Sequence, residues 1–472
     1  MKKKSKKSIK MEVVNPNAAG IDVGSRSHFV AIGQGIEHVR EFGVYSEDLK
    51  IMGQWLLDNK VNTVAMESTG DYWQNLFSEL VRLGIKVDLV NGKFTKNPTS
   101  QKTDVLDCQH IQKLHALGLL RASFLPDEPT EHLRTYCRQR LNFIERKATS
   151  NRKIQKFLKL LNLRLDIVVR DITGLTGMKI IRAITQGEKN PKILASMRHF
   201  NCRKSEEEIA KALVSNDRED LLQCLRQEVR LYDFYNTEIA LIDKIIAIEI
   251  TNYINSMKNV IEHLPSVKKH KRLNKNSLKT IDLNIASYQY FGGVDLLEIP
   301  GVSYSTVLTL MSEIGPNGLD QFPSSKHFTS WLRLAPNNKI SGGRVMSSKV
   351  QKGSNRMKLA FRNAAYSIAK LKGADLHKFY KKIAFKKGGR KAITATARKL
   401  EVIVWNMITK KIPYKAQETY VFLDQKRKQL ATLRREMVKL GLNPNEHDVF
   451  SKPEYRENWL KKQLQAQENI KR

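Results

Sequence analysis

The stretch AGIDVGSRSHFVAIG, residues 19–33, contains two short apolar runs separated by a polar turn at Gly24-Ser25-Arg26. This pattern predicts two strands joined by the turn. Asp22 lies inside the first run, between Ile21 and Val23. A carboxylate with apolar neighbours on both sides needs a hydrogen-bond donor, a positive partner or a metal ion. The stretch therefore predicts the start of a sheet and a candidate functional acid within it.

Strand and helix patterns alternate beyond this stretch. The spacing predicts further strands at 37–45, 62–69 and 85–92, and amphipathic helices at 47–59 and 71–84. Strands that alternate with helices indicate an α/β layer with a partly parallel sheet. The strand at 62–69 contributes a second acid, Glu67, at its end.

A third and a fourth acid follow in QKTDVLDCQH, residues 101–110, at the start of a predicted helix. Asp104 and Asp107 are three residues apart and share a helix face, with Lys102 and Lys113 nearby. Taken singly, such acids are most often turn, capping or solvated residues. Gathered together, four carboxylates repel one another unless cations bind. Mg²⁺ prefers oxygen ligands, and two such ions about 4 Å apart support phosphodiester cleavage.

The second half of the chain changes character. Helical apolar spacing over 133–161 and again over 221–246 predicts two long helices, either an antiparallel hairpin or the seam of a dimeric coiled coil. A turn at Pro300-Gly301 opens a further helix in a second globular unit. A basic loop rich in glycine and serine then feeds an amphipathic helix from about 355.

Composition limits the class of partner. The chain has 472 residues, and 82 Lys and Arg against 47 Asp and Glu give a net charge of +35. Such an excess is typical of proteins with a polyanionic partner, because basic side chains neutralise phosphates. We find no apolar span of bilayer length and no secretory signal after the basic start MKKKSKKSIK. Four scattered cysteines predict neither a zinc site nor disulfides, which suits a reducing cytosol.

These motifs together resemble a known family. GIDVG, Glu67 and KTDVLDCQHIQKLHALGLLRASFLP are similar to the DEDD transposases of the insertion-sequence one-ten/eleven-eleven family, related to the Piv DNA invertases. IPGVSYSTVLTLMSEIG and the later SGGR and KGSNRMKLAFRNAA resemble the family's C-terminal transposase domain. The resemblance covers roughly 19–125 and 295–400.

The resemblance implies a RuvC-like (ribonuclease H-like) N-terminal domain, a helical or coiled-coil middle and a mostly helical C-terminal domain. It implies that Asp22, Glu67, Asp104 and Asp107 form a metal-binding catalytic tetrad for Mg²⁺, with Mn²⁺ as an alternative. It further implies donor and target DNA, a structured guide RNA called the bridge RNA, and a homodimer that assembles to a tetramer. The location implied is the bacterial or archaeal cytoplasm, at the nucleoid.

With these patterns the chain divides into a disordered basic arm (1–17), the RuvC-like DEDD domain (18–125), a helical coiled-coil region (126–265), a basic linker or insertion (266–295), the C-terminal transposase domain (296–412) and a charged helical tail (413–472).

By resemblance, the nucleophile is Ser341 in KISGGR, with Ser347 and Ser348 as nearby alternatives. On spacing alone, Ser-Gly-Gly is a flexible turn. Basic side chains surround it, and we expect Lys102, Arg344, Lys349, Lys352 and Arg356 to bind nucleic acid. No histidine lies beside Ser341, so its activation would come from the metal site. Two other functions stay open: a structure-specific nuclease that uses water as nucleophile, and a non-catalytic basic nucleic-acid-binding protein.

Overall fold

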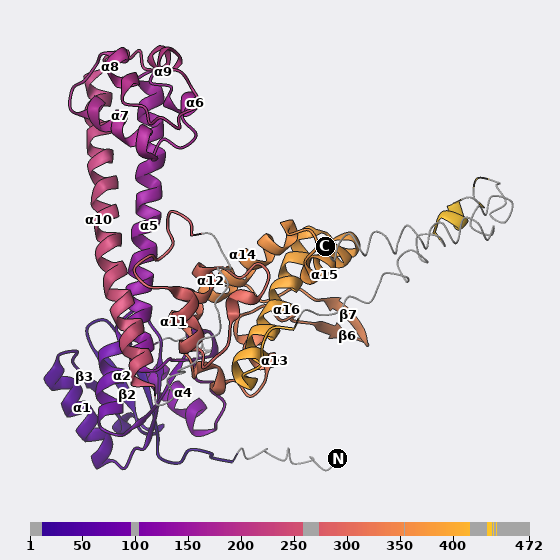
Figure 1. Ribbon diagram of the computed structural model, residues 1–472. Helices are drawn as coiled ribbons and strands as arrows, with labels where there is room; N and C mark the ends of the chain where they lie inside the picture. The colour runs from indigo at the N-terminus through magenta and orange to yellow at the C-terminus, as the bar shows by residue number, and fades with distance from the viewer. Residues whose placement is uncertain are drawn as a thin grey trace, which may run out of the picture. The chain divides into compact units, whose positions relative to one another are not determined.

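The protein is described by a computed structural model that covers residues 12–95, 103–257, 273–353, 355–415, 432–436, 438 and 440. The chain divides into two compact units, Met1–Asp127 and Glu128–Arg472 (Figure 1). Most of the predicted basic arm, the start of the predicted linker, Lys102 and most of the predicted charged tail lie outside the described residues. No helix in the described ranges is both long and apolar enough to cross a membrane.

The first unit contains a five-stranded sheet in the order β3-β2-β1-β4-β5. The strands are β1 (Ala18–Val23), β2 (His28–Ala31), β3 (Val39–Phe42), β4 (Thr63–Glu67) and β5 (Lys86–Val90). β1, β2 and β3 are antiparallel, whereas β4 and β5 run parallel to β1. The predicted strands and the partly parallel sheet are confirmed. A short 3-10 turn, η1 (Ile36–His38), takes the start of the run predicted as the third strand.

Helices lie on both faces of this sheet. The helices are α1 (Ser46–Asp58), α2 (Trp73–Arg82), α3 (Gly92–Thr95) and α4 (Asp104–Ala116). Ala19, Ile21 and Val23 of β1 enter a core that also contains buried side chains of α1 and α2. Successive strand residues alternate between faces. Gly20 and Asp22 therefore face the opposite side, where α4 packs against β1, β2 and β4.

The second unit begins with two long helices, α5 (Glu128–Leu160) and α10 (Glu219–Ser256), which lie side by side (Figure 1). Arg140 of α5 pairs with Asp243 of α10, and Lys153 Nζ donates to Glu228 Oε1 at 2.8 Å. Because residue numbers rise on one helix as they fall on the other, the pair is antiparallel. Of the two predicted arrangements, the structure shows the antiparallel hairpin, formed by two helices of the same chain. Glu228, the acid at a core position of α10, has Lys153 as its partner.

A small helical subdomain caps this hairpin (Figure 1). It contains α6 (Leu165–Val168), α7 (Leu175–Thr185), α8 (Pro191–Ser196) and α9 (Glu206–Ala212), and we call residues 161–218 the tip subdomain. Its apolar side chains form one core with the adjoining ends of α5 and α10, including Ile154, Leu225 and Tyr232. The tip subdomain is therefore a packed body and not an extended connection.

The rest of the second unit is mostly helical. Its elements are α11 (Leu283–Tyr290), η2 (Leu296–Glu298), α12 (Tyr304–Glu313), η3 (Gly318–Gln321), α13 (Ser325–Trp331), β6 (Lys339–Ser341), β7 (Arg344–Ser347), α14 (Arg356–Lys370), α15 (Asp375–Lys387) and α16 (Gly389–Lys410). The predicted turn before α12 is confirmed. Gly301 has φ +84°, and an added Cβ would lie 2.7 Å from the Ala364 carbonyl oxygen, so glycine is required there.

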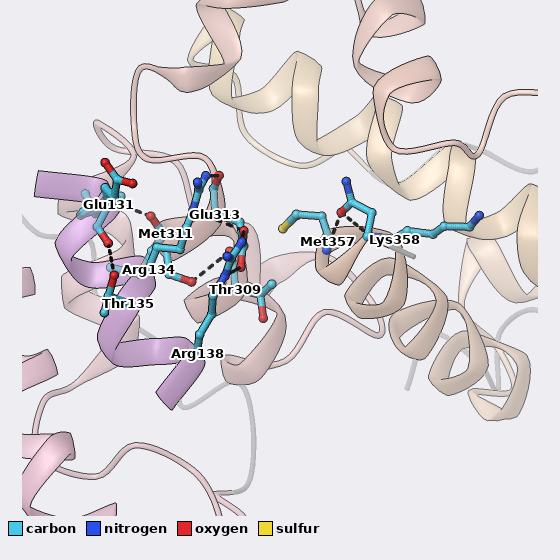
Figure 2. Close-up of polar contacts among 12 residues, drawn as sticks. Glu131, Arg134, Thr135, Arg138, Thr309, Met311, Glu313, Met357 and Lys358 are labelled. Carbon is cyan, nitrogen blue, oxygen red and sulfur yellow. Dashed lines mark hydrogen bonds and ion pairs between the residues drawn. The ribbon is translucent and has the colours of Figure 1, made fainter. Parts of the chain in front are cut away.

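An ion-pair cluster joins the long hairpin to this helical part. Arg138 of α5 donates two hydrogen bonds to the Glu313 carboxylate, at 3.0 and 2.7 Å. Arg134 donates to the Glu313 carbonyl at 2.7 Å (Figure 2). Glu313 is the last residue of α12, where a helix leaves carbonyl groups unpaired. Arg134 satisfies one of them. The cluster fixes α12 against α5, with Arg134 and the Glu313 carboxylate largely desolvated and Arg138 exposed at its edge.

Candidate active site

Two of the predicted acids lie on adjacent parallel strands. Ile21 of β1 and Met66 of β4 are register partners, and Asp22 and Glu67 each follow by one residue. Neighbouring residues at the same register point to the same face of a sheet. Asp22 and Glu67 are both half-buried at this sheet face. The structure thus brings the first two candidate acids together at one edge of the α4 side.

Helix α4 reaches this face because β1 has a glycine under it. An added Cβ at Gly20 would lie 2.6 Å from the Cys108 carbonyl oxygen and 2.7 Å from Gln112 Cα. The side chain of Gln112 donates to the Ala18 carbonyl at 3.2 Å, and Thr63 Oγ1 lies 2.9 Å from His115 Nε2. Burial lowers the pKa of His115, which favours its neutral form in this contact. These contacts fix the position of α4 on the sheet.

The other two acids lie in the first turn of α4. Thr103 is the N-cap, and its Oγ1 accepts a hydrogen bond from the Leu106 amide at 3.3 Å. Asp104 is exposed and Asp107 is half-buried. Burial, with a smaller contribution from the negative charges of Asp22 and Asp107, raises the pKa of the Cys108 thiol to about 12. Because α4 packs on β1 at Cys108, Asp22 of β1 and Asp107 of α4 both lie close enough to Cys108 to act on its thiol.

Glu67 already has hydrogen-bond donors. Thr95 Oγ1 donates to Glu67 Oε2 at 2.7 Å, and Thr69 Oγ1 donates to Glu67 Oε1 at 3.1 Å. An added Cβ at Gly92 would lie 2.7 Å from the Glu67 carboxyl carbon, so glycine leaves room for this carboxylate.

The four acids suit Mg²⁺ in kind, because all their donor atoms are carboxylate oxygens. Across the described part of the chain, however, no three His, Cys, Asp or Glu side chains are gathered closely enough to hold a metal ion. A site shared by these acids would therefore require side-chain movement.

Ser341 lies on a β-hairpin in the second unit. It is the last residue of β6 and pairs directly with Arg344, the first residue of β7. Gly342 and Gly343 between them have φ +53° and +72°, which is typical of a two-residue type I′ turn. Ser341 and Arg344 are exposed and, as register partners, share a face of the hairpin. The predicted turn at Ser-Gly-Gly is confirmed, whereas the wider segment predicted as a loop contains two paired strands.

Hydrogen bonds to backbone carbonyl groups hold the base of this hairpin. The Asn337 amide donates to the Lys349 carbonyl at 3.1 Å, and Arg333 Nη1 donates to the Lys352 carbonyl at 2.7 Å. Asn355 then caps α14 by accepting from the Met357 amide at 2.9 Å, in the region that Figure 2 shows. Lys349, Lys352 and Arg356 are exposed along this path. The hairpin therefore presents its serine and cations to solvent on a fixed base.

The alternative serines have different surroundings. Ser347 is half-buried on β7, where its Oγ accepts from the Lys349 amide at 3.4 Å, and Ser348 is exposed just after the strand. Neither lies at the hairpin turn. Sequence reasoning missed this hairpin, although the alternation in KISGGRVMS around paired glycines is a recognisable signal. It also missed Thr69 and Thr95, for which the sequence offers no signal.

Two family models match segments of this chain. A model described as a transposase matches residues 19–163, and a model described as the transposase IS116/IS110/IS902 family matches residues 295–381. A search of curated proteins finds no match. The matched segments define a DNA-processing enzyme. The chain belongs to the IS110 family of insertion-sequence transposases.

Proposed function

We propose that this transposase cuts and rejoins DNA through a covalent phosphoserine intermediate formed by Ser341. The observation that carries the proposal is the placement of Ser341, exposed at a tight hairpin turn and directly opposite Arg344. A guanidinium beside a hydroxyl can hold a phosphate by charge-assisted hydrogen bonds. The absence of a side chain at Gly342 and Gly343 lets a DNA backbone approach the turn closely.

In the proposed reaction, Ser341 Oγ attacks the phosphorus of a DNA phosphodiester. The new Ser–O–P bond replaces one P–O bond to deoxyribose, and the released DNA hydroxyl takes up a proton. The hydroxyl of a second strand then attacks the phosphoserine and releases the serine. One phosphodiester-type bond is present at every stage, so strands can be exchanged without ATP.

The cations around the hairpin would bind the DNA backbone on either side of the scissile phosphate. Arg344 is placed to contact that phosphate, and Lys349, Lys352 and Arg356 extend the basic path toward α14. Lys102, which precedes Asp104 in the sequence, is also proposed to bind the DNA backbone. Such contacts supply affinity without reading sequence.

We propose that Asp22, Glu67, Asp104 and Asp107 hold Mg²⁺, with Mn²⁺ as a substitute, in a RuvC-like domain. The order of the five-stranded sheet and the shared face of Asp22 and Glu67 support this assignment. When bound, the ion would stabilise the charge that develops on the phosphate. The acids would also provide a proton acceptor for Ser341, since the segment KISGGRVMS contains no acid or histidine.

The family membership extends the proposal to partners. A structured guide RNA would pair with donor and target DNA, and a homodimer would assemble to a tetramer, so that the serine of one copy and the acids of another can form a composite site. The place of action would be the bacterial or archaeal nucleoid in the cytoplasm. The net charge of +35 supports a nucleic-acid partner but does not choose between RNA and DNA.

A second candidate function is a nuclease that uses water as nucleophile. The observation that favours it is the same lack of an acid or histidine in KISGGRVMS, which leaves Ser341 without a local base. In that case the acids would activate water and Ser341 would be only a turn residue.

Covalent trapping separates the two functions. The full chain, RNA from the flank of its element, Mg²⁺ and end-labelled junction DNA are incubated and run on a denaturing gel. We expect a labelled adduct that protease removes and that Ser341→Ala and Asp104→Ala reduce by about 10³-fold or more. Ser348→Ala, an exposed serine near the turn, is the matched control and should keep the adduct. Cleavage without an adduct would favour the nuclease.

A further inference from the structure

The tip subdomain contains a basic cavity that neither matched family segment includes. The family models end at residue 163 and resume at 295. The cavity has a volume of about 860 Å³ and lies among α7, the residues after α8, and α10. This volume is in the range of ligand sites, about 300–1,000 Å³. Lys179, Arg182, Arg198 and Lys275 line it, and no Asp or Glu is among its described lining residues.

Acids just outside the lining hold three of these cations in place. Arg182 pairs with Asp233 at 2.6 Å, Arg198 with Glu206 at 3.3 Å, and Lys275 with Asp171 at 3.6 Å. Such solvent-accessible pairs contribute about 1 kcal/mol or less. They orient the cations, and the Arg182 and Lys275 side chains stay 50% exposed and so accessible to a ligand. Lys179 is exposed and forms no ion pair with any described residue.

The start of α7 adds to the positive potential. Its N-cap is Gly174, which supplies no side-chain acceptor, and its first turn has no acidic residue. The free amide groups at the start of an eleven-residue helix carry partial positive charge. Thr176 Oγ1 accepts from the His199 amide at 3.0 Å and so fixes the segment after α8 beside this helix end.

An aromatic platform lies at the edge of the cavity. The rings of His199 and Phe200 are 4.3 Å apart at an angle of 33°. His199 lines the cavity, whereas Phe200 is 82% exposed. A phenylalanine this exposed makes little contribution to the fold. Beside a group of cations, it has the chemistry that unpaired bases use for stacking.

We propose that the tip subdomain binds an unpaired stretch of nucleic acid, with phosphates at Lys179, Arg182 and Lys275 and a base stacked on Phe200. The cations favour a polyanion over an apolar protein partner, and the exposed ring favours an unpaired base over a duplex, whose bases are already stacked. This site is separate from the serine hairpin, and its occupancy does not depend on the chemistry proposed for Ser341.

Photo-cross-linking of the full chain tests the site. Two probes are used: an oligouridine with 4-thiouridine and the matching oligothymidine with 4-thiothymidine. Cross-linked peptides are mapped by mass spectrometry. We expect a cross-link to the peptide that contains His199 and Phe200. Lys179→Glu and Phe200→Ala should each reduce it about tenfold. Phe200→Tyr keeps the ring and should retain it.

Lys192→Glu is the matched control, because Lys192 is an exposed lysine of the tip subdomain outside the cavity lining. It makes the same charge change and should reduce the cross-link by less than about twofold. A cross-link with either probe supports the site, and the better probe identifies its source as RNA or DNA. No cross-link to this peptide with either probe, or equal losses in Lys179→Glu and Lys192→Glu, would overturn the proposal.

Discussion

The acid-bearing face of the first unit and the serine hairpin of the second unit hold their candidate residues in opposite ways. Asp22 and Glu67 are half-buried on a sheet whose other face enters the core, and α4 is packed directly onto Gly20. Ser341 is exposed on two strands that are held by backbone hydrogen bonds and a glycine turn. Positions set by packing should be sensitive to added volume. Positions set by a turn should be sensitive to backbone conformation.

Gly20→Ala should produce the largest loss of stability. The new methyl group would meet backbone atoms of Cys108 and Gln112, which cannot move without shifting α4. We expect the free energy of unfolding of the first unit to fall by about 3 kcal/mol. Urea denaturation measures it, with Gly84→Ala as a contrast. Gly84 has φ +79° but no atom near its Cβ position, so the smaller loss there is one of backbone strain. Equal losses would show that packing of α4 does not set this face.

Glu401→Gln should change the pH dependence of stability. Glu401 of α16 is fully buried, neither carboxyl oxygen has a hydrogen-bond partner among the described residues, and burial raises its pKa to about 9. The folded state therefore keeps a proton that the unfolded state releases above its ordinary carboxyl pKa. Stability should fall as pH rises toward 9, by about 1.4 kcal/mol per pH unit from this group.

Urea unfolding at several pH values between 6 and 9 measures this pH dependence of stability. The Glu401→Gln variant has no titratable carboxyl group at this position. The difference between the chain and Glu401→Gln should grow with pH. Glu145→Gln, at an exposed glutamate of α5, provides the control and should leave the profile unchanged. Parallel profiles for the chain and Glu401→Gln would contradict the expectation. Glu401, whose carboxyl group has no hydrogen-bond donor among the described residues, is thereby compared with Glu67, whose carboxylate has two donors.

Thr95→Val should have a smaller effect on stability and an informative effect on metal. The buried Thr95 hydroxyl donates to Glu67 Oε2, and its removal should cost about 1 kcal/mol. Thr69→Val, at an exposed donor to the other oxygen, should cost less. If Glu67 binds Mg²⁺, releasing Oε2 should shift the Mg²⁺ concentration needed for half-maximal adduct formation. An unchanged Mg²⁺ titration would argue against Glu67 as a ligand.

Gly342→Asn should have the smallest effect. Asparagine tolerates a positive φ, so a type I′ turn should persist and adduct yield should stay within about twofold. Gly342→Val should reduce adduct yield, because a β-branched residue is strained at φ +53°. Neither change introduces a steric clash, since no described atom lies within 4 Å of the new Cβ, so any loss of melting temperature with valine would come from backbone strain. A normal yield with valine would show that the turn geometry does not position Ser341.

The sequence determined the alternating strands and helices, the helix that bears Asp104 and Asp107, and the two long helices. In each case the signal is local, because apolar periodicity reflects the side of an element that must be buried. The four acids were predicted as a set from the family resemblance, and that set remains a prediction. Their strand register was not predicted, because Glu67 reaches Asp22 only through pairing of segments more than forty residues apart.

Tertiary structure alone decided the remaining features. The close approach of α4 to Gly20, the donors on Glu67 and the burial of Glu401 all arise between segments that are distant in the chain. So does the tip cavity, whose walls come from α7, α10 and Lys275. Local sequence encodes which side of an element is apolar, but contacts between elements depend on how the whole chain packs. For this protein the sequence therefore indicated the elements and the candidate residues, and packing decided which of these residues lie near one another.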